Sequence, residues 1–366
     1  MDIRLTGTGG SGGWPQPGCR CASCARARSA GRSRSPAQLL VDGALVLEPG
    51  AGTGADGPPG GYQVVRIPGG WDVTSPGGAR LLAADGSANT PEPPAGARPY
   101  DLALLDLLGD PAQLGGLRHS GLATGRTVVA ILHADHRVSS EEELARRCGY
   151  WGVIVPEDGD VLTAPASQPA GPGGPPRPGQ SRRVLVLGGA RSGKSRHAEL
   201  RLAAEPQVTY LAAGPYPPGS PPPDDREWSQ RVAAHQSRRP PWWRTVETLD
   251  PAAALRSESG AILFDGAGTW LAGTMQESGA WADGPQPPAA AAQQRVAEKV
   301  DELVAALRET RARVVTVSDE VGSSVHPQTP AGRQFRDQLG WLNQRLTAEA
   351  EEAVLMIAGR ALSLPG

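Results

Sequence analysis

The sequence has few aromatic residues, almost no net charge and no long apolar run. Aromatic side chains make up 4% of the 366 residues, and the formal net charge is -2. Without a strongly positive field the chain lacks an electrostatic basis for binding nucleic acid, so we expect no nucleic-acid partner. No apolar stretch could span a bilayer, and the opening residues do not resemble a secretory signal. We therefore expect a soluble, cytoplasmic protein without a membrane segment.

The low aromatic content does not make the chain disordered. Hydrophobic residues account for 39% of the sequence, and Leu, Val and Ala recur in periodic runs. Because 366 residues exceed what one hydrophobic core usually organises, two domains are expected. A Pro- and Gly-rich stretch without apolar periodicity is typical of a tether. We accordingly predict a domain at 1–163, a linker at 164–181 and a second domain at 182–366.

Cysteine is also scarce, and three of the four cysteines are crowded together. Cys19, Cys21 and Cys24 lie within six residues, whereas Cys148 stands alone. In a cytoplasmic chain such a cluster favours metal binding over disulfides. The alternative is a set of free cysteines in a loop. We expect Cys148 to be a buried free thiol.

Apolar periodicity predicts strands in the first domain and an alternation of strands and helices in the second. The first domain is expected to have one helix, Ser140–Arg147, and the strands Asp2–Thr6, Gln38–Val41, Ala44–Leu47, Gln63–Ile67, Leu102–Leu105, Val128–Leu132 and Gly152–Val155. The second is expected to contain strands Arg183–Leu187, Val208–Ala212, Ala261–Phe264, Arg313–Val317 and Ala353–Ile357, with helices Ser195–Ala204, Asp225–Gln236, Gln293–Thr310 and Ala331–Glu351. This alternation predicts an α/β domain with a mainly parallel sheet.

A phosphate-binding motif of the form G-x-x-x-x-G-K-S separates the first strand and helix of the second domain. It consists of Gly188, Gly189, Ala190, Arg191, Ser192, Gly193, Lys194 and Ser195. Its glycines let backbone N–H groups converge on phosphate, and the following helix adds its positive end. Lys194 would bind the β- and γ-phosphates of ATP or GTP, and the Ser195 hydroxyl would ligate Mg²⁺. A chance glycine turn is the alternative, which the strand–loop–helix context disfavours.

A phosphate site of this kind also needs a carboxylate at the end of a neighbouring strand to position magnesium. Asp265 directly follows the apolar run Ile262–Phe264 and fits this requirement. The competing interpretation is a turn-forming aspartate before Gly266.

One histidine stands among charged residues. The predicted helix at Asp225–Gln236 places Glu227, Arg231 and His235 on one face, and Arg239 follows shortly after. A neutral imidazole beside arginines is suited to attacking phosphorus, because the cations stabilise the developing negative charge. From spacing alone, however, a lone histidine is more often a surface or packing residue.

Ordered motifs run through almost the whole second half. They are GGARSGKSRHAE at 188–199, Arg231-x-x-x-His235 with Arg239-Pro240 and Trp243, Ile262–Asp265 with Trp270-Leu271, Asp319-Glu320-Val321-Gly322 with Pro327, and Arg333-x-Phe335-Arg336-Asp337 with Leu342-Asn343-Gln344-Arg345. In these motifs the second half resembles the bifunctional adenosylcobinamide kinase/adenosylcobinamide-phosphate guanylyltransferase family.

The resemblance implies a RecA-like P-loop domain with two activities. The first phosphorylates the corrinoid adenosylcobinamide with ATP or GTP, and the second transfers GMP from GTP to that phosphate through a guanylylated histidine. His235 occupies the place of that histidine; Lys194 and Asp265 would act with it, and Glu227 and Arg239 would bind nucleotide. Members of the family can form homo-oligomers. Two other functions remain open: a P-loop NTPase or small-molecule kinase with an inert His235, and a zinc-stabilised nucleotide-binding protein.

The second half also departs from the family pattern. Gly266–Thr269 stand where Cys-Leu-Thr-Leu is usual, and Gly273 and Asp319 each stand where Asn is common. The loop at 214–223 is longer and richer in proline. These changes leave the phosphate motif and His235 intact but bear on the shape of the corrinoid pocket.

The first half carries two motifs of its own: Leu5–Gly10 followed by the cysteine cluster, and Ile131-Leu132-His133-Ala134-Asp135-His136. With these motifs it resembles metallo-β-lactamase-fold phosphodiesterases of the phosphonate-degradation type. The resemblance implies a structural Zn²⁺ held by Cys19, Cys21, Cys24 and His136, and it matches His133 and Asp106 to active-site metal ligands. The catalytic H-x-H-x-D-H is absent, since no histidine precedes His119. We therefore expect a shortened, non-hydrolytic α+β domain.

Overall fold

The computed structural model describes residues 1–48, 58, 60–87, 89–164, 181–214, 233, 236–281, 288–323 and 326–365. The described residues form two units, and their main segments meet in the sequence between Ala164 and Ser181. Most of the predicted linker, residues 165–180, lies outside the described part of the chain. No helix among the described residues is both long and apolar enough to cross a membrane.

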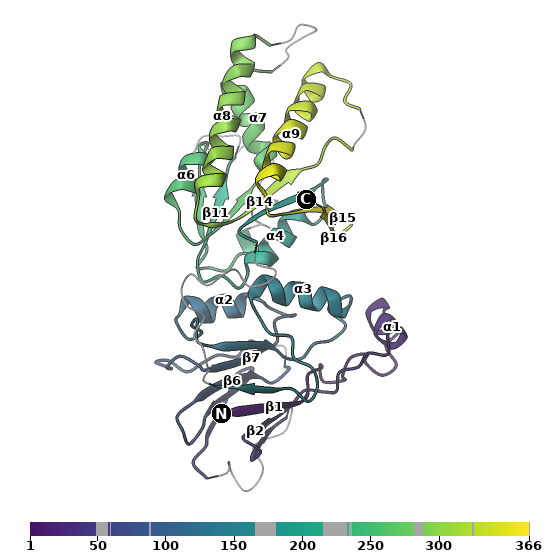
Figure 1. The fold of residues 1–366 in the computed structure, drawn as a ribbon, viewed down its shortest axis with the longest axis vertical. Coiled ribbons are helices and arrows are strands. Elements are labelled where there is room, and N and C mark those ends of the chain that lie inside the picture. The colour runs from purple at the N-terminus through teal and green to yellow at the C-terminus, as the bar shows by residue number, and fades with distance from the viewer. Residues whose placement is uncertain are drawn as a thin grey trace. The chain divides into compact units, whose positions relative to one another are not determined.

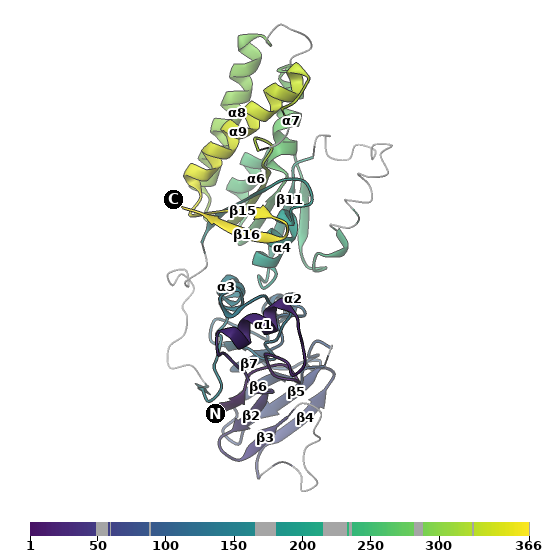
Figure 2. The same cartoon turned by 90° about the vertical axis from the view of Figure 1, so that its right-hand side faces the viewer.

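The first unit contains two sheets and three helices among its described residues (Figures 1 and 2). The smaller sheet has the order β3-β2-β1-β9, with β1 (Asp2–Gly7), β2 (Gln38–Val41), β3 (Leu45–Leu47) and β9 (Val161–Thr163). The larger has the order β4-β5-β6-β7-β8, with β4 (Gln63–Ile67), β5 (Gly70–Thr74), β6 (Arg80–Ala84), β7 (Leu102–Leu105) and β8 (Val128–Ile131). The helices are α1 (Ala22–Ser29), α2 (Ala112–His119) and α3 (Glu141–Trp151).

The two sheets of the first unit face each other across one apolar core. Ile3 and Leu39 of the smaller sheet and Trp71, Leu81 and Leu104 of the larger belong to the same buried cluster. The strands β6 and β7 are buried on both faces, because helices α2 and α3 lie along the outer side of the larger sheet (Figure 1). The α+β character predicted for this unit is therefore present.

The second unit is built on a seven-stranded sheet of order β12-β11-β13-β14-β10-β15-β16. The strands are β10 (Arg183–Gly188), β11 (Val208–Ala212), β12 (Arg244–Glu247), β13 (Ala261–Asp265), β14 (Arg313–Asp319), β15 (Glu352–Ile357) and β16 (Arg360–Leu364). The helices are α4 (Lys194–Leu202), α6 (Pro251–Ser257), α7 (Ala267–Glu277), α8 (Ala290–Glu309) and α9 (Pro330–Glu349). Every pairing is parallel except that of β15 with β16, which confirms the predicted mainly parallel α/β sheet.

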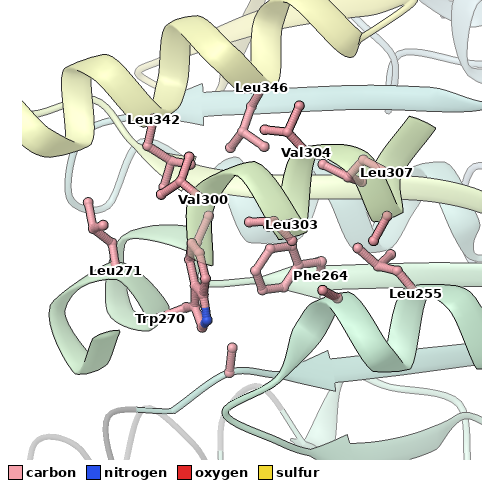
Figure 3. Packing of buried hydrophobic residues seen from close by; sticks show 14 of the residues in the cluster. Leu255, Phe264, Trp270, Leu271, Val300, Leu303, Val304, Leu307, Leu342 and Leu346 are labelled. Atoms are coloured by element: carbon pink, nitrogen blue, oxygen red, sulfur yellow. The ribbon is translucent and has the colours of Figure 1, made fainter. Parts of the chain in front are cut away.

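Helices cover both faces of this sheet. On one face, Trp270 of α7, Leu303 of α8 and Leu342 of α9 pack with Phe264 of β13 in a continuous core (Figure 3). On the other face, residues of α4 and Trp243 pack against the alternate side chains of the same strands. Burying both faces leaves the carboxyl ends of the parallel strands as the edge at which ligands bind in folds of this type.

The structure corrects several of the predicted elements. The strand predicted at Gly152–Val155 is only an isolated bridge at Ile154, because α3 continues to Trp151 and ends in a left-handed Gly152. Elements that periodicity did not reveal are α1, α2, β5, β6, β9, β12, α6, α7 and β16. The helix predicted at Asp225–Gln236 falls almost entirely outside the described residues.

Candidate functional site

The phosphate motif forms the connection between β10 and α4. Its loop contains two residues with positive φ, Arg191 at 57° and Gly193 at 94°. The positive φ of Arg191 is one that residues with a side chain seldom adopt and that often occurs in functional loops. The φ of Gly193 suits only glycine. At the start of the loop, a Cβ on Gly188 would lie 2.9 Å from the Met356 carbonyl oxygen. The sequence therefore folds this loop tightly against β15 and opens it toward the carboxyl edge.

The lysine of the motif faces an acidic group. Lys194 Nζ lies 2.8 Å from Asp319 Oδ1 and donates a 3.2 Å hydrogen bond to the carbonyl oxygen of Gly189. Asp319 is the last residue of β14, which pairs directly with the strand that carries the motif. The side chain of Lys194 is 17% exposed, so the ammonium group is partly shielded from solvent.

Oxygen donors converge beside the lysine. Ser195 Oγ donates to Asp265 Oδ1 over 3.3 Å, and the hydroxyl of Tyr210 donates to Asp265 Oδ2 over 2.9 Å. Burial of Tyr210, together with the neighbouring Asp265 carboxylate, raises the pKa of the tyrosine well above its usual range, so the phenol remains a donor. A hydroxyl next to a carboxylate is the oxygen ligand set that Mg²⁺ prefers. Asp265 thus precedes the turn at Gly266 and also accepts hydrogen bonds from the hydroxyls of Ser195 and Tyr210.

Arginines border this site on the side of β11. The Arg238 guanidinium forms two hydrogen bonds of 2.9 and 3.0 Å with the Glu199 carboxylate, and this pairing raises the pKa of Arg238. Arg239 stacks on the ring of Tyr210, with its guanidinium carbon 3.2 Å from the ring centroid. The contact is a cation–π interaction, which fixes the direction of both side chains.

The structure brings together part of the predicted constellation. Lys194, Ser195 and Asp265 meet at one edge, and Arg239 reaches it through Tyr210. The other two predicted residues, Glu227 and His235, lie outside the described residues.

Sequence reasoning missed two contributors to the site, Tyr210 and Glu199. Both lay in recognisable places: Tyr210 is inside a predicted strand that runs toward the phosphate motif, and Glu199 belongs to the 188–199 motif itself.

The first unit contains a second candidate site, formed by three cysteines and a histidine. The ligand atoms of Cys19, Cys21, Cys24 and His136 all lie within 4.8 Å of one another. His136 Nδ1 is 3.8 Å from Cys19 Sγ and 3.7 Å from Cys24 Sγ. Ligands about 2.3 Å from a tetrahedral zinc ion are separated by about 3.8 Å, so these spacings fit such a metal. The structure thus contains a Cys₃His cluster able to hold a metal ion.

The cluster is organised by the start of α1. Cys21 precedes this helix and its sulfur accepts a 3.4 Å hydrogen bond from the backbone N–H of Cys24. That hydrogen bond lowers the pKa of Cys21, as is usual for a thiol at a helix N-terminus. Burial raises the pKa of Cys24 to about 11. As predicted, Cys148 is a buried free thiol.

The two residues that matched active-site metal ligands do not form a metal site among the described residues. His133 is fully buried, with φ of 61°, and its Nε2 lies 3.0 Å from the carbonyl oxygen of Ala84. Asp106 is paired with the Arg137 guanidinium over 2.9 Å, and Arg137 also binds Asp135. A cation supplied by the protein thus neutralises the Asp106 carboxylate.

Comparison with known proteins bears mainly on the second unit. A family model described as cobinamide kinase / cobinamide phosphate guanyltransferase matches residues 184–364. The bifunctional adenosylcobalamin biosynthesis protein CobU of Salmonella typhimurium is 37% identical over 180 residues, which cover 48% of this chain and 96% of that protein. The corresponding protein CobP of Pseudomonas aeruginosa is 37% identical over 190 residues, covering 50% of this chain and 98% of that protein. These matches confirm the resemblance predicted for the second half.

Among solved structures, Zn²⁺-bound PqqB of Methylobacterium extorquens covers 44% of this chain and 100% of its own, with 15% identity and a TM-score of 0.29. A TM-score this low carries no argument about the fold of the first unit. The metallo-β-lactamase likeness therefore rests on the sequence motifs.

Proposed function

The chain belongs to the cobinamide kinase / cobinamide phosphate guanyltransferase family, and from this premise we propose that it is a bifunctional transferase of cobalamin biosynthesis. Its first reaction would transfer the γ-phosphoryl group of ATP or GTP to the hydroxyl oxygen of adenosylcobinamide, with loss of the hydroxyl proton and release of ADP or GDP. Its second would join GMP from GTP to the resulting phosphate and release pyrophosphate. We assign these reactions to a domain at 182–366, preceded by a linker at 164–181 and a domain at 1–163.

The observation that carries the proposal is the convergence of Lys194, Ser195 and Asp265 at the carboxyl edge of the sheet. The backbone of the 188–195 loop would cradle the phosphates, and Lys194 would neutralise charge on the transferred group. Ser195 and Asp265 would hold Mg²⁺, which when bound stabilises negative charge on the phosphates. Tyr210 would keep the Asp265 carboxylate turned toward Ser195.

His235 is the proposed nucleophile of the second reaction. Its imidazole nitrogen would form a bond to the α-phosphorus of GTP while the bond from that phosphorus to the bridging oxygen breaks, and pyrophosphate would leave. A phosphate oxygen of adenosylcobinamide phosphate would then attack the same phosphorus, releasing the histidine and giving adenosylcobinamide-GDP. Covalent catalysis of this kind divides one difficult displacement into two easier ones.

GTP labelled at the α-phosphate tests this assignment. We expect an acid-labile, base-stable protein adduct in the wild type and none in His235→Ala. His326→Ala is the matched control, because it removes an exposed histidine of the same half and should leave the adduct unchanged. An active wild type that never forms the adduct would instead identify a P-loop kinase or NTPase with an inert His235. Absence of corrinoid turnover at saturating GTP and Mg²⁺ would reduce the second half to a nucleotide-binding module.

For the first unit we propose that Cys19, Cys21, Cys24 and His136 hold a structural Zn²⁺. Three thiolates and one imidazole would complete a tetrahedral shell with no open position, so the ion would stabilise the fold rather than catalyse a reaction. Metal analysis of purified protein should give about one zinc per chain, lost in Cys19→Ser and retained in Cys148→Ala, the buried cysteine outside the cluster. Equal zinc contents in both variants would rule out this assignment.

A further inference from the structure

The motif lysine is paired with an anion of the protein itself. Lys194 Nζ contacts Asp319 Oδ1 at 2.8 Å and the Gly189 carbonyl oxygen at 3.2 Å. The ammonium group therefore has two acceptors within the protein. A triphosphate can use this cation fully only if the contact with Asp319 is weakened.

The backbone that carries Asp319 is firmly held. Asn343, a buried residue of α9, donates through Nδ2 to the Asp319 carbonyl oxygen over 3.0 Å. The Oδ1 atom of the same asparagine accepts a 2.6 Å hydrogen bond from the buried hydroxyl of Ser318. The Asp319 side chain is 38% exposed, so its carboxylate can rotate away from the lysine without disturbing the strand.

The surroundings of Asp319 favour a negative charge there. A Cβ built on Gly268 would lie 3.3 Å from Asp319 Oδ2, which places the carboxylate against the first turn of α7. The N-terminal turn of a helix stabilises anions. Asp265 supplies a second carboxylate at the same edge. Two carboxylates, of Asp319 and Asp265, thus lie at the edge where the phosphates of the proposed substrate would bind.

We infer that Asp319 competes with the phosphates of the nucleotide for Lys194, and that this competition makes tight nucleotide binding depend on Mg²⁺. Without a metal ion, the phosphates must displace the carboxylate and then remain close to it, so the like charges oppose binding. With Mg²⁺ the added positive charge offsets this repulsion. The inference rests on the proposed nucleotide site but concerns a residue outside its phosphate motif, at a position where the resemblance leads one to expect asparagine.

Asp319→Asn tests the inference, because it keeps the shape of the side chain and removes the charge. The dissociation constant of a fluorescent GTP analogue should be measured with EDTA and again with saturating Mg²⁺. We expect metal-free binding to become about tenfold tighter, which corresponds to about 1.4 kcal/mol. The gain should shrink to about twofold or less with Mg²⁺. Unchanged thermal unfolding would show that the fold is intact.

Two further variants isolate the mechanism. Glu320→Gln is the matched control, since the Glu320 carboxylate accepts from the backbone of its own turn at Gly322 and Ser323. Its affinities should equal those of the wild type. In a Lys194→Met background, Asp319→Asn should tighten metal-free binding less than it does with Lys194 present, because competition for the lysine is gone and only the direct repulsion between carboxylate and phosphates remains to be relieved.

Three results would overturn the inference. Metal-free affinity unchanged or weaker in Asp319→Asn would show that the carboxylate does not compete. Weaker binding only with Mg²⁺ would make Asp319 a metal ligand instead. In both cases the wild type still binds nucleotide, and the proposed function is unaffected. If neither protein binds the nucleotide under either condition, the nucleotide site and the inference are both wrong.

Discussion

The hydrogen bond from Tyr210 to Asp265 offers a direct test of how the site is held together. Tyr210→Phe removes one oxygen atom and leaves the ring in its buried position, stacked under Arg239. The lost contact is a 2.9 Å hydrogen bond to Asp265 Oδ2. Burial and the neighbouring carboxylate raise the pKa of Tyr210, so the wild-type phenol donates this hydrogen bond throughout the neutral pH range.

The magnitude follows from the type of contact. A hydrogen bond to a charged group contributes about 1.5–3 kcal/mol to stability. If removing this hydrogen bond raises the free energy of the transition state by about 1.4 kcal/mol, kcat/KM falls about tenfold. We expect a decrease of at least that size in adenosylcobinamide phosphorylation, with a higher Mg²⁺ concentration needed for half-maximal rate, because Asp265 would turn less reliably toward Ser195.

Tyr100→Phe in the first unit is a matched control. Tyr100 is buried and donates a 3.0 Å hydrogen bond to Asp72 Oδ2, the same chemistry in a place without nucleotide. Thermal unfolding should show a comparable loss of stability in both variants, whereas only Tyr210→Phe should change kinetics. A Tyr210→Phe enzyme with wild-type kinetics at every Mg²⁺ concentration would refute the idea that the phenol orients Asp265.

Two further predictions concern stability. Gly188→Ala should lower the free energy of unfolding by about 1–3 kcal/mol, because the added Cβ would lie 2.9 Å from the Met356 carbonyl oxygen. Gly189→Ala is the control, because its Cβ would meet nothing within 4 Å, and it should leave thermal unfolding unchanged. Equal losses of stability in the two variants would contradict this account. In the first unit, burial of Asp158 opposes its charge, but hydrogen bonds to the carboxylate, including those from the Thr8 N–H and hydroxyl, outweigh it and lower the pKa of Asp158 from 3.8. A carboxyl group whose pKa is lower in the folded state stabilises the fold at pH values above its unfolded-state pKa. This stabilisation is lost as the pH falls through the folded-state pKa. Asp158→Asn should therefore cost about 1 kcal/mol at pH 7, with the difference disappearing in unfolding measurements as the pH falls below about 3.8; a constant difference would contradict the charge-based explanation.

The sequence predicted those parts of the fold that depend on local pattern. The strand β10, the phosphate motif and helix α4 follow from an apolar run, paired glycines and a helical continuation, and Asp265 follows from the rule that carboxyl ends of parallel strands meet. The helix α7 was missed because Gly268, Thr269 and Gly273 have low helix propensity. It forms because Trp270 and Met275 are buried in the core, which is a tertiary effect.

Other parts of the site depend on register, which a single sequence does not specify. Tyr210 reaches Asp265 because β11 pairs with β13 so that Ala212 lies opposite Asp265 and Tyr210 lies opposite Leu263. Side chains two positions apart share a face, so the tyrosine lies diagonally across from the carboxylate. A shift of one residue would turn Tyr210 to the opposite face of the sheet. The contact is therefore visible only once the pairing of the strands is known.

The first unit shows the same division between motif and geometry. His133 and His136 are three residues apart, and the resemblance matched them to two different metal sites. In the structure their surroundings differ, because His136 lies with the three cysteines whereas His133 is buried against the Ala84 carbonyl. The crowding of three cysteines within six residues predicted the cluster, and in the structure Cys21 precedes a helix whose first turn contains Cys24. Asp106 pairs with Arg137, and a guanidinium that binds this carboxylate competes with any metal ion for the same oxygens.

Charge balance at the carboxyl edge of the second unit constrains how its substrate enters. Lys194 is paired with Asp319, Arg238 is paired with Glu199, and Asp265 receives only hydroxyl donors in the contacts described above. A triphosphate brings several further negative charges to a place where these two cations already have carboxylate partners. Phosphates that use Lys194 or Arg238 must therefore either break an existing ion pair or bring a cation with them, and a magnesium complex of the nucleotide does the second at lower cost. The dependence on Mg²⁺ proposed for this enzyme thus follows from the ion pairs at this edge as well as from the needs of phosphoryl transfer.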